Sequence, residues 1–274
     1  MDGRTPTVLG RGRICCHCLL VEAADRLVLV DTGFGLRDVA NPRSRLSPFF
    51  LALLSPDFRE ERTAVRQIEA LGFDPRDVRD IVLTHLDFDH AGGLDDFPHA
   101  RVHLLKAERD HAVARRTWLD RQRFRPEQWH FREQWRVHEP TAGERWLGFE
   151  CVRELAGLPP EILLVPLAGH TLGHAGVAID TGGRWLLQAG DAYFWHEEMN
   201  AERPRCTPGL AMYQALMDKD RGQRLANQAR LRRLAHERKG EVRLFCAHDP
   251  IEFEALAAPG AAAAAGRAAG SLPA

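Results

Sequence analysis

A dense cluster of histidine and aspartate residues follows a short apolar segment. Residues 80–84, DIVLT, are typical of a buried strand, and they are followed by His85, Asp87, Asp89 and His90. Imidazole and carboxylate groups are the usual protein ligands of zinc, iron and manganese. In an extended segment the first three of these side chains alternate and can converge, while the fourth can reach another side of a metal. The chain must therefore fold so that this strand ends at a metal-binding pocket.

The same residue types recur where three later apolar segments end. The segment EILLVPL, 161–167, is followed by His170 and His174. The segments RWLLQAGD, 184–191, and EVRLFCAHD, 241–249, contain Asp191 and His248 at or near their ends. Ligands on loops that are held by rigid strands are a common architecture of catalytic sites. We therefore expect these residues to meet at one edge of an α/β fold.

The rest of the chain alternates between predicted strands and helices. Further strands are expected over 13–23, 27–33, 100–105 and 176–182, and helices over 61–73, 106–118 and 210–237. We expect residues 1–12 to form a flexible arm and residues 257–274, rich in alanine and glycine, to be a disordered tail. The stretch 109–150 carries several tryptophan and arginine residues, and is either an inserted helical cap or a part of the core.

Composition narrows the classes of function. The chain has 274 residues and a formal net charge of −1, so its total charge favours neither nucleic acid nor an anionic membrane as a partner. No apolar run approaches the roughly 18–20 residues needed to span a bilayer, and we identify no signal peptide. The cysteines around Cys15, Cys16 and Cys18 are interpreted as reduced thiols in a packed strand, which fits the cytoplasm.

These motifs together resemble one known family. THLDFDHAGGL is similar to the HxHxDH signature of the metallo-β-lactamase superfamily, in the style of N-acyl homoserine lactone lactonases and glyoxalase II. Asp31-Thr32-Gly33, the GHTLGH segment at 169–174, Gly190-Asp191 and Ala247-His248 match further family motifs in the expected order. The resemblance implies a single domain over residues 13–256. It implies a four-layer αβ/βα sandwich of the α/β class, with the metal site at the sheet edges.

The resemblance also implies a set of ligands for two divalent metal ions. Zinc is the first expectation, and iron or manganese is the alternative. Asp191 would bridge the two ions, His174 would be structural, and Asp31 would fix a turn or a ligand by hydrogen bonds. The first ion would be held by His85, Asp87 and His170, and the second by Asp89, His90 and His248.

Asp87 departs from the family pattern, which has histidine at this position. An ionised Asp87 gives the site three negative charges with Asp89 and Asp191, against four positive charges from two divalent ions. It lowers the Lewis acidity of the site, and its oxygen ligands move the preference from zinc towards iron or manganese. Direct ligation by the shorter carboxylate requires backbone movement or a bridging water, so a single ion remains an alternative.

The function implied by the resemblance is metal-dependent hydrolysis of a lactone, small ester or thioester. Hydroxide generated at the metals would attack the carbonyl carbon, and Asp89 or Asp87 would protonate the leaving group. Candidate contacts to a small-molecule substrate are Phe88, Tyr193, Phe194, Trp195 and His196. The apolar segment SPFFLALL, 47–54, fits either a core helix or a homodimer interface.

The sequence is compatible with three other classes of function. The same fold could carry an iron-dependent redox reaction, in the manner of a persulfide dioxygenase. It could also hydrolyse phosphodiesters, although no basic patch supports this. Finally, the chain could retain metal ligands without catalysing any reaction.

Overall fold

The first half of the chain builds a five-stranded mixed sheet. In the computed structural model, residues 12–23, 25–130, 132–140, 144–152, 155 and 157–258 are described, so most of the predicted arm and of the predicted tail lie outside the described residues. The strand order is β1-β2-β3-β4-β5, with β1 antiparallel to β2 and the later neighbours parallel. The bounds are Leu19–Ala23 for β1, Arg26–Val30 for β2, Val78–Val82 for β3, Arg101–Leu105 for β4 and Trp135–His138 for β5.

The second half builds a four-stranded sheet of order β11-β10-β9-β8. Its strands pair antiparallel except for β10 and β11, which are parallel. A two-stranded ribbon, β6 with β7, accompanies it. The bounds are Arg145–Trp146 for β6, Phe149–Glu150 for β7, Ile162–Pro166 for β8, Ala175–Asp180 for β9, Trp185–Gln188 for β10 and Val242–Phe245 for β11.

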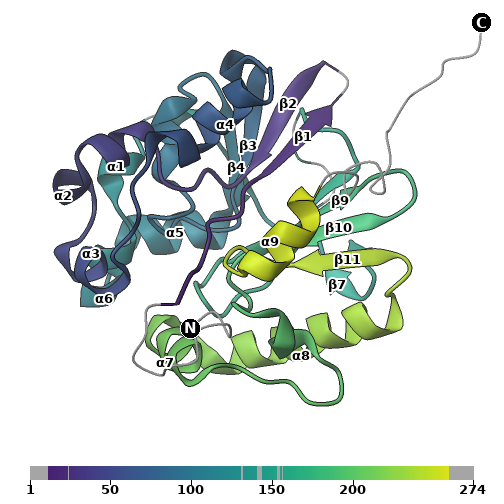
Figure 1. The fold of residues 1–274 in the computed structure, drawn as a ribbon. Helices are drawn as coiled ribbons and strands as arrows, with labels where there is room; N and C mark the ends of the chain where they lie inside the picture. The colour runs from purple at the N-terminus through teal and green to yellow at the C-terminus, as the bar shows by residue number, and fades with distance from the viewer. Residues whose placement is uncertain are drawn as a thin grey trace, which may run out of the picture.

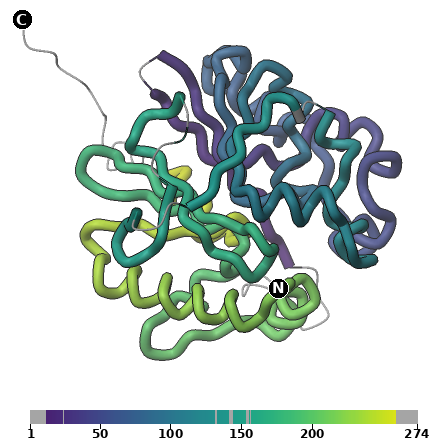
Figure 2. Tube along the Cα trace, turned by 180° about the vertical axis from the view of Figure 1, so that it is seen from behind, coloured from purple at the N-terminus to yellow at the C-terminus, as the bar shows by residue number. Residues whose placement is uncertain are grey.

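Helices cover the outer faces of the two sheets, as Figures 1 and 2 show from opposite sides. The α-helices are α1 Leu36–Ala40, α2 Pro42–Arg45, α3 Pro48–Leu54, α4 Ala64–Ala70, α5 Lys106–Ala114, α6 Trp118–Arg123, α7 Pro208–Met217, α8 Arg221–Glu237 and α9 Pro250–Ala257. The 3-10 helices are η1 Glu60–Arg62, η2 Pro75–Asp77, η3 Gly92–Asp96, η4 Pro126–Gln128, η5 Arg132–Gln134 and η6 His196–Met199. Among the described residues, no helix has the length and hydropathy that a membrane span requires.

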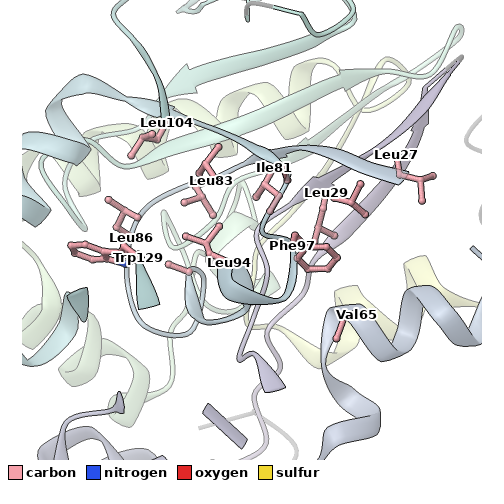
Figure 3. Close-up of a cluster of buried hydrophobic side chains, with 14 of the residues drawn as sticks. Leu27, Leu29, Val65, Ile81, Leu83, Leu86, Leu94, Phe97, Leu104 and Trp129 are labelled. Atoms are coloured by element: carbon pink, nitrogen blue, oxygen red, sulfur yellow. The ribbon is translucent and has the colours of Figure 1, made fainter. Parts of the chain in front are cut away.

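The alternation of side chains along β2 explains the layers. Leu27 and Leu29 face a cluster that includes residues of α4 and α5, shown in Figure 3. Val28 and Val30 face the opposite way, into a cluster with residues of β8 and β9. A third cluster joins the second sheet to α8. The order is therefore helices, sheet, sheet, helices, and this confirms the predicted four-layer sandwich.

Several predicted elements differ from the structure. The helix predicted over 106–118 ends at Ala114, and α6 begins at Trp118. The first strand begins at Leu19 rather than at residue 13, because the preceding segment runs along the second half of the chain instead. There His17 N donates to the Ala247 carbonyl (2.8 Å), and the Gln188 side chain donates to the His17 carbonyl. The helix predicted over 210–237 is two helices, since Asp220 caps a new helix at Gln223 N.

The stretch 109–150 contributes to the sheet and to both cores. Strand β5 pairs with β4, and Trp129 packs in the cluster below the first sheet. Trp146 packs in the cluster of the second sheet, whereas Trp118 is exposed. The segment 47–54 forms α3, whose Phe50 is buried against Phe88 in a cluster described below.

Candidate metal centre

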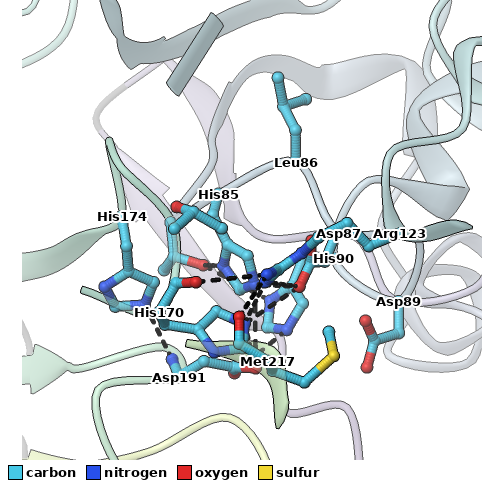
Figure 4. A network of polar contacts seen from close by, with 12 residues as sticks. His85, Leu86, Asp87, Asp89, His90, Arg123, His170, His174, Asp191 and Met217 are labelled. Atoms are coloured by element: carbon cyan, nitrogen blue, oxygen red, sulfur yellow. Dashed lines mark hydrogen bonds and ion pairs between the residues drawn. The ribbon is translucent and has the colours of Figure 1, made fainter. Parts of the chain in front are cut away.

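The predicted ligands meet at one edge of the sandwich. The loop after β3 supplies His85, Asp87, Asp89 and His90, and loops after β8, β10 and β11 supply the remaining residues, His170, Asp191 and His248. All of them are buried, and Figure 4 shows that most point toward a common centre. Two sets of donor atoms within 4.8 Å of one another are central. We call His85, Asp87, His170 and Asp191 the first ligand group, and His90, Asp191 and His248 the second ligand group.

The second ligand group has the spacing of metal ligands. Asp191 Oδ1 lies 3.2 Å from His90 Nε2 and 3.0 Å from His248 Nε2, and the two imidazole nitrogens are 3.4 Å apart. Donors of a tetrahedral zinc ion with bonds of about 2.0–2.1 Å are separated by about 3.3 Å. The three atoms can therefore share one ion without rearrangement.

The hydrogen bonds of the far imidazole nitrogens fix the tautomers of this group. His90 Nδ1 is 2.9 Å from Asp31 Oδ2, and His248 Nδ1 is 2.6 Å from the Cys15 carbonyl. Because an ionised carboxylate and a carbonyl only accept, each Nδ1 carries a hydrogen, and in the neutral imidazoles each Nε2 directs its lone pair inward. Two lone pairs at 3.4 Å repel each other, and the buried Asp191 Oδ1 has no hydrogen-bond partner. The group fits a cation.

The electrostatics of the second ligand group agree with this fit. Burial disfavours charge on the His90 imidazole, but Asp191 and Asp31 outweigh it and raise the pKa of His90 well above its usual value. Burial likewise opposes ionisation of Asp191, yet His248 and His90 hold the pKa of Asp191 well below its usual range. The group thus attracts a positive charge, either a proton or a divalent ion that displaces it.

The first ligand group brings four donors together, and Arg123 contacts two of them, Asp87 and His170. Asp87 Oδ2 lies 3.3 Å from His85 Nε2 and 3.0 Å from His170 Nε2. Arg123 donates from Nε to Asp87 Oδ1 and from Nη2 to Asp87 Oδ2, both at 2.6 Å. Burial would raise the pKa of Asp87, but the Arg123 guanidinium holds it well below its usual range.

Asp89 belongs to neither ligand group. With 8% of its surface exposed, it is the most exposed of the predicted ligands. Its Oδ2 is 3.7 Å from His248 Nε2, and the Cys16 thiol lies within 4.8 Å of both residues. Burial raises the pKa of Asp89, although the charges of His90 and His248 oppose this.

Asp31 and His174 make hydrogen bonds next to the ligand groups. Asp31 Oδ1 accepts from Thr84 N and Oδ2 from Thr84 Oγ1, each at 2.8 Å. Thr84 Oγ1 in turn lies 2.9 Å from His85 Nδ1, which leaves His85 Nε2 directed into the centre without a partner. His174 accepts from Asp191 N at 2.9 Å, so it orients that loop.

Of the five candidate substrate contacts, two lie in an apolar cluster beside the centre, one lies at its edge, and two make hydrogen bonds elsewhere. Phe194 stacks on the His248 ring, with centroids 4.9 Å apart, and Phe88 lies in the same apolar cluster. Tyr193 is fully buried and donates to Glu252, so its hydroxyl is engaged elsewhere. Trp195 is partly buried at the edge of the cluster. The His196 side chain is hydrogen-bonded to Asp249. We call this the aromatic cluster; its buried members are Leu46, Phe50, Phe88, Phe194, Leu210, Tyr213 and Met217.

Two residues near the centre were missed by sequence reasoning. Arg123 lies in the stretch 109–150, whose arginines the sequence did not connect with the metal ligands. No sequence pattern singled out Tyr213, whose ring centroid lies 5.6 Å from that of Phe194. Burial, followed by the charges of Asp89 and Asp191, raises the pKa of Tyr213 well above its usual value.

A sequence profile described as the metallo-beta-lactamase superfamily matches residues 12–248. The chain belongs to the metallo-β-lactamase superfamily. This membership confirms the family that the motifs indicated. Within the superfamily, the chain is 43% identical over 241 residues to the "probable metallo-hydrolase Rv2300c" of Mycobacterium tuberculosis, covering 88% of this chain and 76% of that one. It is 27% identical over 189 residues to an N-acyl homoserine lactonase of Bacillus cereus, covering 68% and 67%.

Solved structures of superfamily members share the fold. An N-acyl homoserine lactone hydrolase with N-hexanoyl-L-homoserine at its catalytic metal center superposes with a TM-score of 0.65 and 22% identity, covering 90% of this chain and 88% of that one. AidC, a dizinc quorum-quenching lactonase, superposes with a TM-score of 0.57 and 20% identity, covering 86% and 73%. At this identity the likeness establishes the metallo-β-lactamase fold.

Proposed function

We propose that this protein is a metal-dependent hydrolase that opens lactones or cleaves small esters or thioesters bearing an apolar group. The observation that carries the proposal is the second ligand group, in which two inward lone pairs and an unpartnered carboxylate oxygen converge at ligand spacing. A divalent ion bound there would polarise a carbonyl group and lower the pKa of water.

The residues of the chain supply the remaining tasks. Both oxygens of Asp87 are engaged by Arg123, so Asp89 is the carboxylate we propose to carry the proton to the leaving group. Asp89 is the most exposed of the predicted ligands, which suits this role. The Tyr213 hydroxyl is our candidate donor to a substrate oxygen.

The aromatic cluster supports an apolar substrate group. Phe194 joins this cluster to the second ligand group, because its ring stacks on His248 and packs against Tyr213. An acyl or alkyl chain could lie along such a surface while a carbonyl group reaches the centre. The lactonases among the relatives favour a lactone as the first substrate to try.

Removal and return of metal test the proposal. Protein stripped with a chelator should lose hydrolysis of a lactone and ester panel, and added zinc, manganese or iron(II) should restore it. Tyr213→Phe should lower kcat by about 100-fold if its hydroxyl stabilises an oxyanion. Phosphodiester cleavage, oxygen-dependent turnover or bound metal without any turnover would each replace the proposal with one of the alternative classes.

A further inference from the structure

A fully buried guanidinium lies against the first ligand group. Arg123 ends α6 and has no exposed surface. Its planar end makes a two-pronged contact with Asp87, at 2.6 Å on each side. Paired guanidinium–carboxylate contacts of this kind are among the strongest polar contacts in proteins. The pairing gives the unusual aspartate of the motif a fixed positive partner (Figure 4).

Every N–H group of this guanidinium has an acceptor. Beyond the two contacts to Asp87, Nη1 donates to the Met217 carbonyl (2.7 Å) and to the His170 carbonyl (3.3 Å). The second Nη2 hydrogen is directed to His170 Nε2 at 2.7 Å. Arginine only donates, so in this contact His170 Nε2 accepts with its single lone pair, and the other contact of this nitrogen, to Asp87 Oδ2 at 3.0 Å, also lies within the protein. That lone pair is then not available to a metal ion.

His170 therefore differs from the histidines of the second ligand group. The Nδ1 atoms of His90 and His248 donate to fixed acceptors, which reserves their Nε2 atoms for a ligand. The buried His170 Nδ1 has no hydrogen-bond partner, and its Nε2 is occupied by Arg123. The Arg123 side chain therefore already contacts two of the four donors of the first ligand group, Asp87 and His170.

The charge balance points in the same direction. When all three are ionised, Asp87, Asp89 and Asp191 bring three negative charges to the centre, and when Asp89 carries the proton proposed above they bring two. Arg123 neutralises the charge of Asp87 in either case, and one divalent ion compensates what remains. A second ion would leave the buried centre with at least two uncompensated positive charges, one of them on an arginine that cannot lose its proton.

We propose that the Arg123 guanidinium replaces the first metal ion, so that the chain binds a single divalent ion at the second ligand group. The first ligand group does not fit a metal while this arginine is present. Arg123 is a positioning residue, since it holds Asp87 and His170 and has no free donor for a substrate. This inference refines the proposed function, because both rely on an ion at the second ligand group.

The metal content of the protein tests this directly. Purified protein would be stripped, dialysed against zinc or manganese, freed of excess metal and analysed for metal per chain. One ion per chain is expected. For manganese-loaded protein, an EPR spectrum of isolated ions rather than of a coupled pair is expected. Two ions per chain in the wild-type protein would overturn the proposal.

Removing the guanidinium should open the first ligand group. Arg123→Met frees Asp87 and His170, which with His85 make three ligands, and two ions per chain are expected. If Arg123→Met does not fold, the double variant Asp87→His, Arg123→Met replaces it in the test, because it removes the carboxylate that Arg123 pairs with. This double variant should also bind two ions per chain. Folded variants that still bind one ion would contradict the role of Arg123.

A second buried arginine provides the matched control. Arg45 donates to Asp38 at 2.6 Å and to Asp95 at 2.8 Å, and neither carboxylate belongs to a ligand group. Arg45→Met should therefore leave one ion per chain. Turnover separates this inference from the proposed function. One ion without hydrolysis of any lactone or ester would refute the function alone, whereas two ions with hydrolysis would refute the role of Arg123 alone.

Discussion

Replacing Asp31 by asparagine should weaken metal binding while leaving the backbone in place. Asp31 has a φ of 55°, in the left-handed region that asparagine tolerates better than most residues. Its Oδ1 accepts from Thr84 N, and its Oδ2 accepts from Thr84 Oγ1 and His90 Nδ1. In Asp31→Asn the group facing those last two donors becomes an amide N–H, so His90 loses the acceptor that fixes its tautomer.

The size of the effect follows from this contact. Loss of a carboxylate that orients a metal-bound histidine typically lowers metal affinity about 10- to 100-fold. That range corresponds to about 1.4–2.7 kcal/mol. It agrees with the cost of about 1–3 kcal/mol for leaving one buried donor unsatisfied, here His90 Nδ1–H.

Competition between the protein and a chromophoric zinc chelator would measure the affinity. Asp80→Asn is the matched control, because Asp80 is equally buried on β3 but accepts from Arg101 and His103, away from the ligand groups. We expect the control to lose stability and to keep its zinc affinity. Wild-type zinc affinity in folded Asp31→Asn would refute the reasoning that Asp31 sets the tautomer of His90.

Two further substitutions test the packing beside the centre and the pH dependence of stability. In Gly173→Ala the new Cβ would overlap the backbone of Glu108, so urea denaturation should give a loss of at least about 1–3 kcal/mol. Gly183→Ala, with open space around it, should be near neutral, and equal losses would contradict this reading. Burial raises the pKa of Glu252 from 4.5 to about 7, so the folded state keeps a proton that the unfolded chain releases, and stability falls as pH rises between those values. Glu252→Gln should remove up to about 3 kcal/mol of this loss in the free energy of unfolding. Urea unfolding at pH 5 and pH 7 measures the loss, and the same loss in the variant as in the wild type would exclude Glu252 as its origin.

The position of the candidate ligands at one sheet edge could be predicted because each follows an apolar segment. An apolar strand followed by a cluster such as His85 to His90 places polar side chains at a sheet edge whatever the tertiary details are. The order of the later motifs then indicated that His170, Asp191 and His248 belong to the same centre. The layers were predictable for a similar reason, since the period of two along β2 requires apolar neighbours on both faces.

The partner of Asp87 could not be predicted from such a pattern. Arg123 stands in an arginine-rich helix whose first residue, Trp118, is exposed, so the local sequence resembles a solvated face. Only the fold brings this helix end against the loop after β3. The sequence did contain a partial signal, because an acid at a position normally occupied by a neutral ligand calls for a compensating charge.

The path of the chain before β1 has a practical consequence for work on this protein. The carbonyl of Cys15 accepts the His248 Nδ1 hydrogen, and Cys15 N lies 3.4 Å from the His248 carbonyl. One of the earliest described residues thus orients a ligand that comes from near the last strand. Shortening the amino-terminal side past this point would release the His248 imidazole from that carbonyl.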